Sequence, residues 1–375
     1  MTSSAVAGAS NVRRQEREVA GPLRAGVAAL RGNSAIDIAD VETDEMSTIA
    51  TAGKAWTLVT GGAGFIGSHT VDALIGAGES VVVFDDFSTG SRLNLAGWAG
   101  CERLRIIEAD ICDGLFAPLL HAFNGNPPRI GKIVHLAAQT SVVNSMLNPL
   151  QDIRNNYIGT AHVLEFARAT GVDSIVFSSS SSVYCGEHQF PTPEDGMQLP
   201  VSPYAVNKLA CEHLIRMYAR SHGIRATILR FFNVFGPRQR ASSPYSGVIS
   251  IFSDRAMRGE PLTIHGDGTQ TRDFVFVTDV AAAILAAGAS HAARGAVINI
   301  GSGRETRILD LATTIIDTAA GRSEVRFAPS RAGSIERSCA AIDRAVSLLG
   351  FCPRVDLRAG IEATVAWRAS LAEAA

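Results

Sequence analysis

The sequence contains little that could stabilise a fold through covalent or metal cross-links. Its six cysteines include no CxxC pair and no matching histidine spacing. Neither a disulfide framework nor a zinc site is therefore expected. Reduced thiols of this kind are typical of a cytoplasmic protein. We predict that the protein binds no metal and is located in the cytoplasm.

Excess charge and long hydrophobic runs are absent as well. The formal net charge is -2, with both signs spread along the chain, so no basic surface for nucleic acid or an anionic membrane is expected. No apolar run approaches the length of a membrane span, and the first 30 residues lack the hydrophobic core of a signal peptide. A small-molecule partner fits this composition better.

Aromatic residues are missing from the amino-terminal part of the chain. Residues 1–54 contain none and are rich in Ala, Ser, Gly, Arg and Glu, so they cannot form a packed core. We expect a disordered extension there, with Met46 as a possible true start. The chain as a whole is 375 residues long and 46% apolar, which suffices for two unequal lobes.

The folded pattern begins with a strand, a glycine turn, a helix and a second strand. Gly61, Gly64 and Gly67 have the spacing GxxGxxG directly after the predicted strand at 57–60. Glycines at this spacing permit a tight turn, close approach to a pyrophosphate and close packing of helix on strand. Asp85 follows the second strand, where its carboxylate accepts both ribose hydroxyls and repels a 2′-phosphate. The unit predicts NAD rather than NADP.

Two further strand ends add candidate cofactor contacts. The strand at 104–108 ends before Asp110 and Ile111, and we expect the Asp110 carboxylate to meet the adenine amine or simply to form a turn. The run at 132–138 reads as a fourth strand, and its small residues Ala137 and Ala138 let the chain pass close to the cofactor. His135 within this strand is interpreted as structural.

A serine-rich strand end and a tyrosine–lysine pair carry the candidate chemistry. The apolar run at 175–177 predicts a strand that ends in five serines, 178–182, whose hydroxyls would face a ligand crevice. Tyr204 and Lys208 lie four residues apart on a predicted helix and thus share one face. A fixed positive charge there favours phenolate, and a shift of the tyrosine pKa from about 10 to near 7 needs about 4 kcal/mol.

Seven motifs occur in an order that resembles the extended short-chain dehydrogenase/reductase family, and within it the NAD-dependent nucleotide-sugar 4-epimerases. They are TGGAGFIG, HLAAQTSV, FSSSSSVY, SPYAVNK, RFFNVFGPRQ, RDFVFVTDV and INIGSG. The resemblance covers about residues 56–367. It implies that Tyr204 is the catalytic acid/base, that Lys208 is its electrostatic partner and a ribose ligand, and that Ser180 binds the reacting oxygen. It also places Phe65 and Ile66, within the glycine motif, at the cofactor.

The same resemblance implies the substrate contacts. Asn233 and Arg272 would bind the nucleotide diphosphate, with Arg331 as a second clamp, and Ser338 would line the pocket beside the sugar's 2-substituent. Three positions depart from the family pattern: Cys185 replaces a glycine, Asn207 stands where serine is common, and Ser334 stands where an acid is usual. None of the three is a proton-transfer group.

The implied reaction is inversion of C4 of a UDP-hexose through a planar 4-keto intermediate, with hydride passed to NAD and back. UDP-glucose/galactose and their N-acetylated forms are the expected substrates. A sugar 4,6-dehydratase is disfavoured because Ser181 and Ser182 occupy its Asp-Glu positions. An oxidoreductase, a decarboxylase or a UDP-glucuronate epimerase on the same scaffold stays open. A non-catalytic dinucleotide sensor would not need Ser180, Tyr204 and Lys208 together.

The predicted architecture is α/β, with a doubly wound, Rossmann-like parallel sheet and a smaller carboxyl-terminal substrate domain. We assign residues 55–236 to the NAD-binding domain, with 271–300 returning to it, and residues 237–375 to the substrate-binding domain. The predicted helices at 152–170 and 203–221 carry apolar positions on more than one side. They are therefore expected to pair with their copies in a homodimer.

Overall fold

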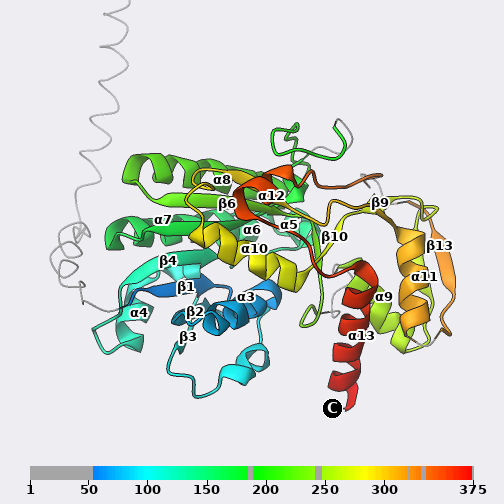
Figure 1. The fold of residues 1–375 in the computed structure, drawn as a ribbon, viewed down its shortest axis with the longest axis horizontal. Helices are drawn as coiled ribbons and strands as arrows, with labels where there is room; N and C mark the ends of the chain where they lie inside the picture. Colours follow the sequence, from blue (N-terminus) through cyan, green and yellow to red (C-terminus); the bar gives the residue numbers. More distant parts are fainter. Residues whose placement is uncertain (1–53, 185–188, 241–246, 320, 331–334, 374–375) are drawn as a thin grey trace, which may run out of the picture. The chain divides into compact units, whose positions relative to one another are not determined.

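A seven-stranded sheet in which every pairing is parallel forms the centre of the fold (Figure 1). The computed structural model describes residues 54–184, 189–240, 247–319, 321–330 and 335–373. In spatial order the strands are β11 (Val297–Ile300), β6 (Arg225–Phe231), β5 (Ser174–Ser180), β4 (Ile130–His135), β1 (Trp56–Thr60), β2 (Val81–Asp85) and β3 (Leu104–Glu108). The chain order reverses between β1 and β4. This is the switch point at which such sheets bind ligands beyond their carboxyl ends.

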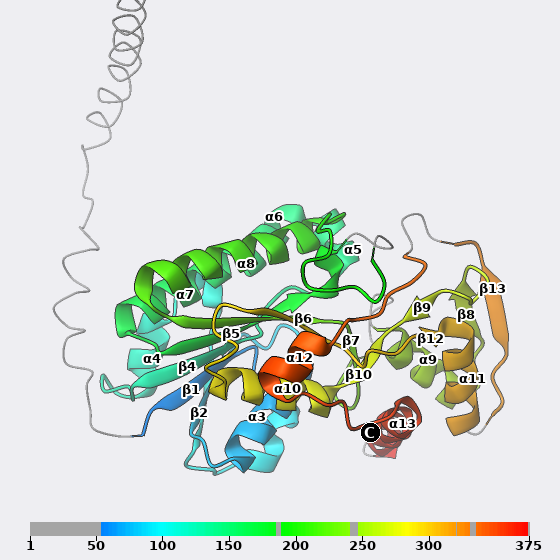
Figure 2. The ribbon, with the colours of Figure 1, turned by 45° about the horizontal axis from the view of Figure 1, so that its top comes forward.

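Helices cover both faces of this sheet (Figure 2). On one face lie α4 (Phe116–Ala122), α7 (Gly159–Thr170) and α8 (Pro203–His222), and on the other lie α3 (Phe65–Gly76), α10 (Val277–Ala289) and α12 (Asp343–Leu349). The expected doubly wound α/β fold is thereby confirmed.

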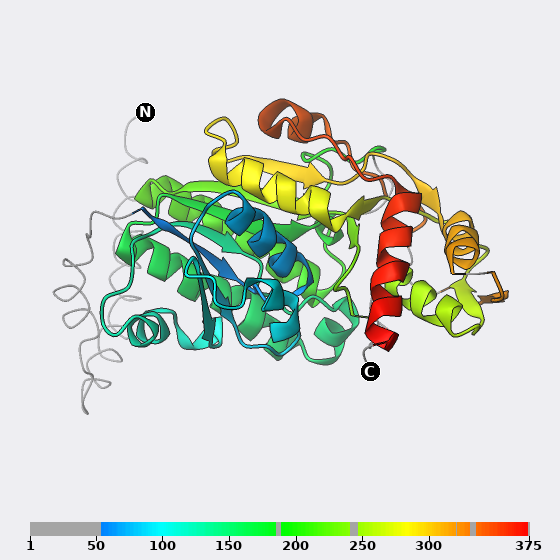
Figure 3. The same cartoon turned by 60° about the horizontal axis from the view of Figure 1, so that its bottom comes forward.

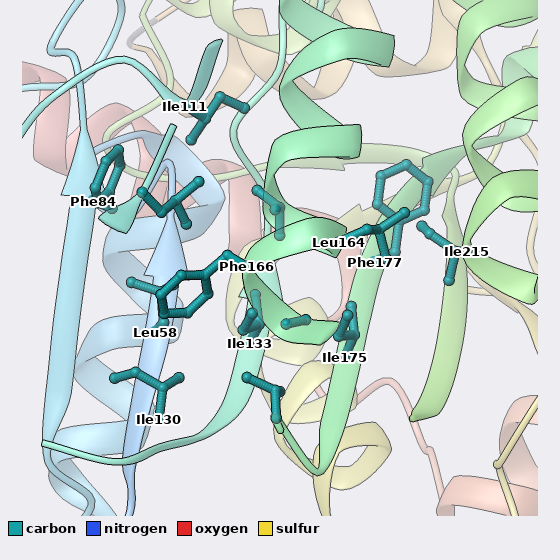
Figure 4. Close-up of a cluster of buried hydrophobic side chains, with 14 of the residues drawn as sticks. Leu58, Phe84, Ile111, Ile130, Ile133, Leu164, Phe166, Ile175, Phe177 and Ile215 are labelled. Carbon is teal, nitrogen blue, oxygen red and sulfur yellow. The ribbon is translucent and has the colours of Figure 1, made fainter. Parts of the chain in front are cut away.

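Alternation along the strands divides the apolar side chains between two cores. Leu58, Ile133 and Ile175 point to the α7 and α8 side, where they pack with Leu164 and Ile215 (Figure 4). Their chain neighbours Val59, Val134 and Val176 point to the α3 and α10 side. Because successive strand residues face opposite sides, a strand buried on both faces must be apolar throughout. This requirement explains the continuous valine and isoleucine runs of the sequence.

A third core lies in the carboxyl-terminal part of the chain, where Phe252, Leu262, Leu311 and Ile361 are buried together. Its helices are α9 (Val248–Met257), α11 (Ile308–Thr318) and α13 (Leu357–Glu373), and α13 runs to the end marked C (Figure 3). Three short strand pairs belong to this half of the chain: β7 (Asn233–Phe235) with β10 (Phe274–Phe276), β9 (Thr271–Arg272) with β12 (Thr306–Arg307), and β8 (Leu262–His265) with β13 (Val325–Ala328).

Several predicted boundaries differ from the structure. The segment 152–170 is not one helix, because α6 (Pro149–Asp152) continues into a π-helical turn η4 (Ile153–Ile158) before α7 begins. Asn155 and Asn156 therefore lie inside a helical run. The fourth strand ends at His135 and not at Ala138. The predicted extension at 1–54 lies outside the described residues except for Lys54.

Candidate active site

The glycine turn joins β1 to α3 at the switch point. Gly61 has a positive φ of 70°, and a Cβ there would stand 2.7 Å from the backbone nitrogen of Ala137. A Cβ on Gly67 would stand 2.0 Å from the carbonyl oxygen of Gly61. Side chains at these two positions would thus push α3 away from the turn and β4 away from β1. The predicted tasks of tight turn and close helix packing fall on Gly61 and Gly67.

The amino terminus of α3 fits a dinucleotide pyrophosphate. Gly64 is its N-cap, and within the part of the chain that the structure describes no side chain caps this end. The first backbone N–H groups of α3, from Phe65 to Gly67, have no intrahelical acceptor, as in any helix start. A free 12-residue helix end of this kind favours an anion through its N–H groups and its dipole. The Phe65 and Ile66 side chains are half-buried against the third core.

Asp85 is fixed at the end of β2 for the role expected of it. Its Oδ2 accepts a hydrogen bond from the backbone N of Ala63 at 2.8 Å, and its Oδ1 accepts one from the N of Phe87 at 2.9 Å. Burial raises the pKa of Asp85, and the two backbone hydrogen bonds lower it. A carboxylate has about four acceptor sites, so two remain for the ribose hydroxyls of NAD.

The other predicted cofactor residues lie at neighbouring strand ends. Asp110 caps the 3₁₀ turn η3 (Ile111–Asp113) by accepting from the N of Cys112 at 2.9 Å, which is the turn-forming role considered above. The Ile111 side chain is buried in the core on the α7 side. Ala137 and Ala138 are half-buried just beyond β4, beside the glycine turn. A contact of these four residues with the adenosine or nicotinamide half of NAD stays a prediction.

Strand β5 ends within the serine run, three residues later than the apolar run suggests. β5 extends to Ser180, and the Ser178 and Ser179 side chains are buried rather than turned to a crevice. Ser178 donates to the carbonyl oxygen of His135 at 3.2 Å, and Ser179 donates to Glu212 at 2.5 Å. The expectation that all five hydroxyls face the crevice is wrong for these two, because their polar groups find partners inside the fold.

Ser180 is the first half-buried serine of the run, and it stands beside Tyr204. Its Oγ accepts hydrogen bonds from the backbone N of Ser182 at 3.1 Å and from the Ser182 hydroxyl at 2.9 Å. Tyr204 lies in the first turn of α8, which begins with Ser202 as N-cap and Pro203 at its first position. The structure brings together Ser180 and Tyr204, the two residues that the sequence predicts to be catalytic, because their side chains form a hydrogen bond.

The protein alone keeps the Tyr204 phenol protonated at neutral pH. Burial raises its pKa to about 12, a hydrogen bond with the Ser180 side chain lowers it, and the charge of Asp152 raises it. The expected pKa near 7 is thus not produced by the surrounding side chains. When NAD is bound, the positive charge of its nicotinamide favours the phenolate.

Lys208 is one helical turn beyond Tyr204 and is also buried. Its ammonium donates to the carbonyl oxygen of Ser178 at 2.8 Å and stands 5.9 Å from the Tyr204 ring centre. Burial lowers the pKa of Lys208 to about 8, while the charges of Cys211, Asp152 and Glu212 raise it. The predicted shared face is confirmed, and the cation is held by the active-site strand.

His135 has the structural role that the sequence suggests. One ring nitrogen is 2.7 Å from the Thr60 hydroxyl and the other is 3.0 Å from the Thr160 hydroxyl. Burial lowers its pKa to about 3, with a further lowering from the charge of Lys208. A neutral His135 therefore ties β4 to β1 and α7 without adding a second cation beside Lys208.

Two buried polar groups near the site were missed by the sequence reasoning. Glu212 and Arg230 form an ion pair with N and O atoms 2.7 Å apart, and both side chains are 1% exposed. Asp152 is fully buried against Asn207 and Asn156. Glu212 follows Lys208 by four residues and thus shares its helix face. This spacing could have predicted that Glu212 lies near the site. Nothing in the sequence spacing points to Asp152.

The predicted diphosphate contacts lie on neighbouring short strands, β7 and β9. Asn233 donates through Nδ2 to the carbonyl oxygen of Asp273 at 3.1 Å, which leaves its amide oxygen available. Arg272 is half-buried and donates to the carbonyl oxygen of Thr271 at 2.7 Å, and burial lowers its pKa. Among the described residues no carboxylate pairs with Arg272. A desolvated guanidinium without an acidic partner is suited to an anionic ligand.

Asp273 holds the segments around this arginine. It is fully buried and accepts hydrogen bonds from the backbone N atoms of Ser302, Gly303 and Ala340 at 2.6, 3.0 and 3.0 Å. Ser338 lies two residues before Ala340 and is half-buried. Its predicted place in a sugar pocket stays a prediction, and Arg331 and Ser334 lie outside the described residues.

Two negative findings concern the described residues alone. No group of three or more His, Cys, Asp or Glu side chains within them is arranged to hold a metal ion. None of their helices combines the length and the apolar character that crossing a membrane requires.

Curated relatives and solved structures are similar to this chain over most of its length. A UDP-glucose 4-epimerase of Mycolicibacterium smegmatis is 40% identical over 310 residues, which are 82% of this chain and 97% of the relative. The solved UDP-glucose 4-epimerase of Thermotoga maritima, with UDP-glucose, superposes with a TM-score of 0.77 at 37% identity, covering 84% of this chain and 99% of that one.

Two other solved structures differ in substrate. The UDP-N-acetylglucosamine 4-epimerase of Methanobrevibacter ruminantium has a TM-score of 0.78 at 34% identity, covering 85% of this chain and 99% of that one. The UDP-glucuronic acid 4-epimerase of Bacillus cereus, with UDP-glucuronic acid and NAD, has a TM-score of 0.76 at 34% identity, covering 84% and 99%. The model of the NAD dependent epimerase/dehydratase family matches residues 57–301. NAD is therefore the cofactor, and the chain belongs to the NAD dependent epimerase/dehydratase family.

Proposed function

We propose that this enzyme inverts C4 of a UDP-hexose, with UDP-glucose and UDP-galactose as substrates. The observation that carries the proposal is the grouping of Ser180, Tyr204 and Lys208 at the carboxyl end of β5, beside the glycine turn that fits NAD. Two proteins that align with this chain over 97% and 99% of their own lengths are named UDP-glucose 4-epimerases.

Each residue of the group has a separate task. As phenolate, Tyr204 removes the proton of the sugar 4-hydroxyl, and as phenol it returns that proton after the ring has turned. Ser180 donates a hydrogen bond to the same sugar oxygen. Lys208 holds a positive charge near the phenolate and is positioned by the Ser178 carbonyl. Bound NAD supplies the acceptor and donor of the C4 hydride.

The substrate's diphosphate would lie against Arg272 and Asn233, with Arg331 as a second clamp. The half-buried Arg272 retains donors for two phosphate oxygens because it spends one nitrogen on the Thr271 carbonyl. By this assignment residues 55–236 form the NAD-binding domain and 237–375 the substrate-binding domain, except that 271–300 return to the NAD-binding domain with α10 and β11, and α12 also packs on its sheet.

Acceptance of N-acetylated sugars is the finer part of the proposal. A serine at position 338 leaves room for an acetamido group that a tyrosine would exclude, and its hydroxyl can bind the added carbonyl. UDP-glucuronate is the main alternative substrate, and oxidation or decarboxylation is the alternative reaction. These alternatives use the same hydride transfer at C4 as the proposed epimerisation, so Ser180, Tyr204 and Lys208 do not distinguish them from it.

A homodimer is proposed from an exposed apolar surface on α5 (Val142–Leu147), α6 and α8. Met146, Leu147 and Leu150 are 60%, 69% and 80% exposed, and Val206 on α8 is also exposed. Apolar side chains that gather on neighbouring helices are suited to pairing with a second copy. Replacement of Leu150 by glutamate should yield a monomer in light scattering, and an unchanged dimer would contradict this interface.

Product analysis tests the proposed function. The purified protein is offered UDP-glucose, UDP-N-acetylglucosamine and UDP-glucuronate separately, and the sugars are separated after reaction. We expect UDP-galactose from the first and UDP-N-acetylgalactosamine from the second. Turnover of UDP-glucuronate alone, or release of carbon dioxide from it, would replace the proposal by its alternative. A cytoplasmic location stays a prediction.

A further inference from the structure

A buried polar network lies directly behind the catalytic tyrosine and lysine. Asp152, at the end of α6, is fully buried and forms no ion pair within the described residues. Its Oδ1 accepts from the amides of Gln139 at 2.7 Å and Asn156 at 3.0 Å, and its Oδ2 accepts from Asn207 at 2.7 Å. A buried carboxylate is costly unless it is hydrogen-bonded, and here three amide donors supply the compensation.

The network connects the end of α6, the turn η4 and the loop at Gln139 to the first turn of α8. α6 and α5 lie beside the start of α8 (Figure 2). Asn207 is in the same turn of α8 as Tyr204 and immediately precedes Lys208, while Asp152 is followed by the π-helical turn η4. Such turns often occur at functional sites. Asn207 is also one of the departures from the family pattern, and the shorter side chain of serine cannot reach the Asp152 carboxylate in the same way.

We propose that Asp152 and Asn207 are positioning residues whose buried hydrogen bond anchors the first turn of α8 and so fixes the Tyr204 phenol and the Lys208 ammonium against the reacting sugar. This inference rests on the proposed function of the same site. The Asn207 amide is the only donor to Asp152 that comes from α8 among the described residues, because the other two come from Gln139 and Asn156. Loss of this one bond thus frees the catalytic helix turn without removing the rest of the network.

The Asp152 charge also acts on the pair that it positions. It raises the pKa of Tyr204, for which burial is the larger cause, and it raises the pKa of Lys208, which burial lowers. The other titratable groups around Lys208 are Tyr204, Cys211 and Glu212 on α8, neutral His135 on β4, and Arg230 on β6, which is paired with Glu212. Among the described residues, Asp152 is therefore the carboxylate near Lys208 that has no cationic partner.

The test uses the NAD-loaded enzyme and three single variants, Asp152→Asn, Asn207→Ser and the control Asp173→Asn, together with the double variant of the first two. Asp173 pairs with Arg129 at the opposite end of β5 and lies outside the catalytic machinery. For each variant, kcat and KM are measured across pH. The titration of Tyr204 is followed by tyrosinate absorbance, with the Tyr204→Phe spectrum subtracted.

Asn207→Ser should lower kcat between about 10-fold and 100-fold with little change in KM, because a displacement of about 1 Å can cost about 10²-fold. Asp152→Asn should lower kcat and also move the Tyr204 titration and the kcat profile to lower pH, since a charge that raises both pKa values is gone. The double variant should be no worse than the more damaging single variant, because both remove the same bond. Asp173→Asn should match the wild type.

Two results would overturn the inference. One is a kcat within two-fold of the control for Asn207→Ser, and this variant decides the matter if Asp152→Asn does not fold. The other is additive loss in the double variant with the Tyr204 titration unmoved, which is the result of a merely structural role. The Tyr204 titration can be measured without a sugar substrate. If it shifts in Asp152→Asn while the wild-type enzyme shows no epimerase activity, the proposed function is rejected but the coupling between the Asp152 charge and Tyr204 is retained.

Discussion

Replacing Tyr204 by phenylalanine isolates the proton-transfer role from every other contact of the residue. The change deletes one oxygen from a side chain that is 8% exposed, and it keeps the ring that packs in the first turn of α8. The lost hydrogen bond with Ser180 should alter the free energy of unfolding by only about 1 kcal/mol. The fold and the NAD site should therefore survive.

The expected effect on turnover is much larger than the effect on stability. A general acid/base group contributes about 10² to 10⁴ in rate, which corresponds to about 2.7 to 5.4 kcal/mol of activation free energy. We expect kcat for UDP-glucose to fall by this factor while KM and bound NAD stay near the wild-type values. Sugar interconversion, nucleotide-sugar binding and released dinucleotide are measured on the same preparation.

Tyr218→Phe provides a matched control on the same helix. Tyr218 lies near the carboxyl end of α8, and its hydroxyl donates to Glu165, away from the glycine turn. It should retain wild-type kcat. If Tyr204→Phe also retained more than about a tenth of wild-type turnover, the base would be misplaced, because the lower bound for such a group is about 10².

Three further predictions follow from the site. The protein should purify with NAD bound at Asp85 and the glycine turn, measured as dinucleotide released on denaturation, and a preference for NADP would contradict this. Burial lowers the pKa of Lys208 to about 8, so kcat should fall as the pH rises through that range and the ammonium loses its proton. A kcat that stays constant to well above pH 8 would refute the role of the Lys208 cation. Ser338→Tyr should depress turnover of the N-acetylated sugars while sparing UDP-glucose; equal losses on both would remove Ser338 from the pocket.

The sheet was predictable from sequence because its strands are buried on both faces. A continuous apolar run such as 81–84 can only be a parallel strand or a buried helix segment, and the glycine turn and Asp85 decide between these. Tyr204 and Lys208 could be placed on one helix face because residues four apart lie on the same side of an α-helix, whatever the rest of the fold. Ser180 was located from the motif FSSSSSVY, and in the structure its side chain forms a hydrogen bond with Tyr204.

What the sequence did not provide depends on contacts between distant segments. The hydroxyls of Ser178 and Ser179 were predicted to face the crevice because no local pattern shows that they donate hydrogen bonds to the His135 carbonyl oxygen and to Glu212. The π-helical turn after Asp152 has no periodicity that would distinguish it from α-helix. The high pKa of Tyr204 follows from burial, which three-dimensional packing alone determines.

The fate of the hydrogen at C4 tests the central claim most directly. UDP-glucose carrying deuterium at C4 is converted by the purified enzyme in ordinary water, and the UDP-galactose formed is examined by mass spectrometry and proton NMR. If C4 is inverted by hydride transfer to enzyme-bound NAD and back, the product should retain the deuterium at C4 with no net reduction of free dinucleotide. Loss of the label to solvent, or accumulation of an oxidised sugar with stoichiometric reduced dinucleotide, would contradict the account.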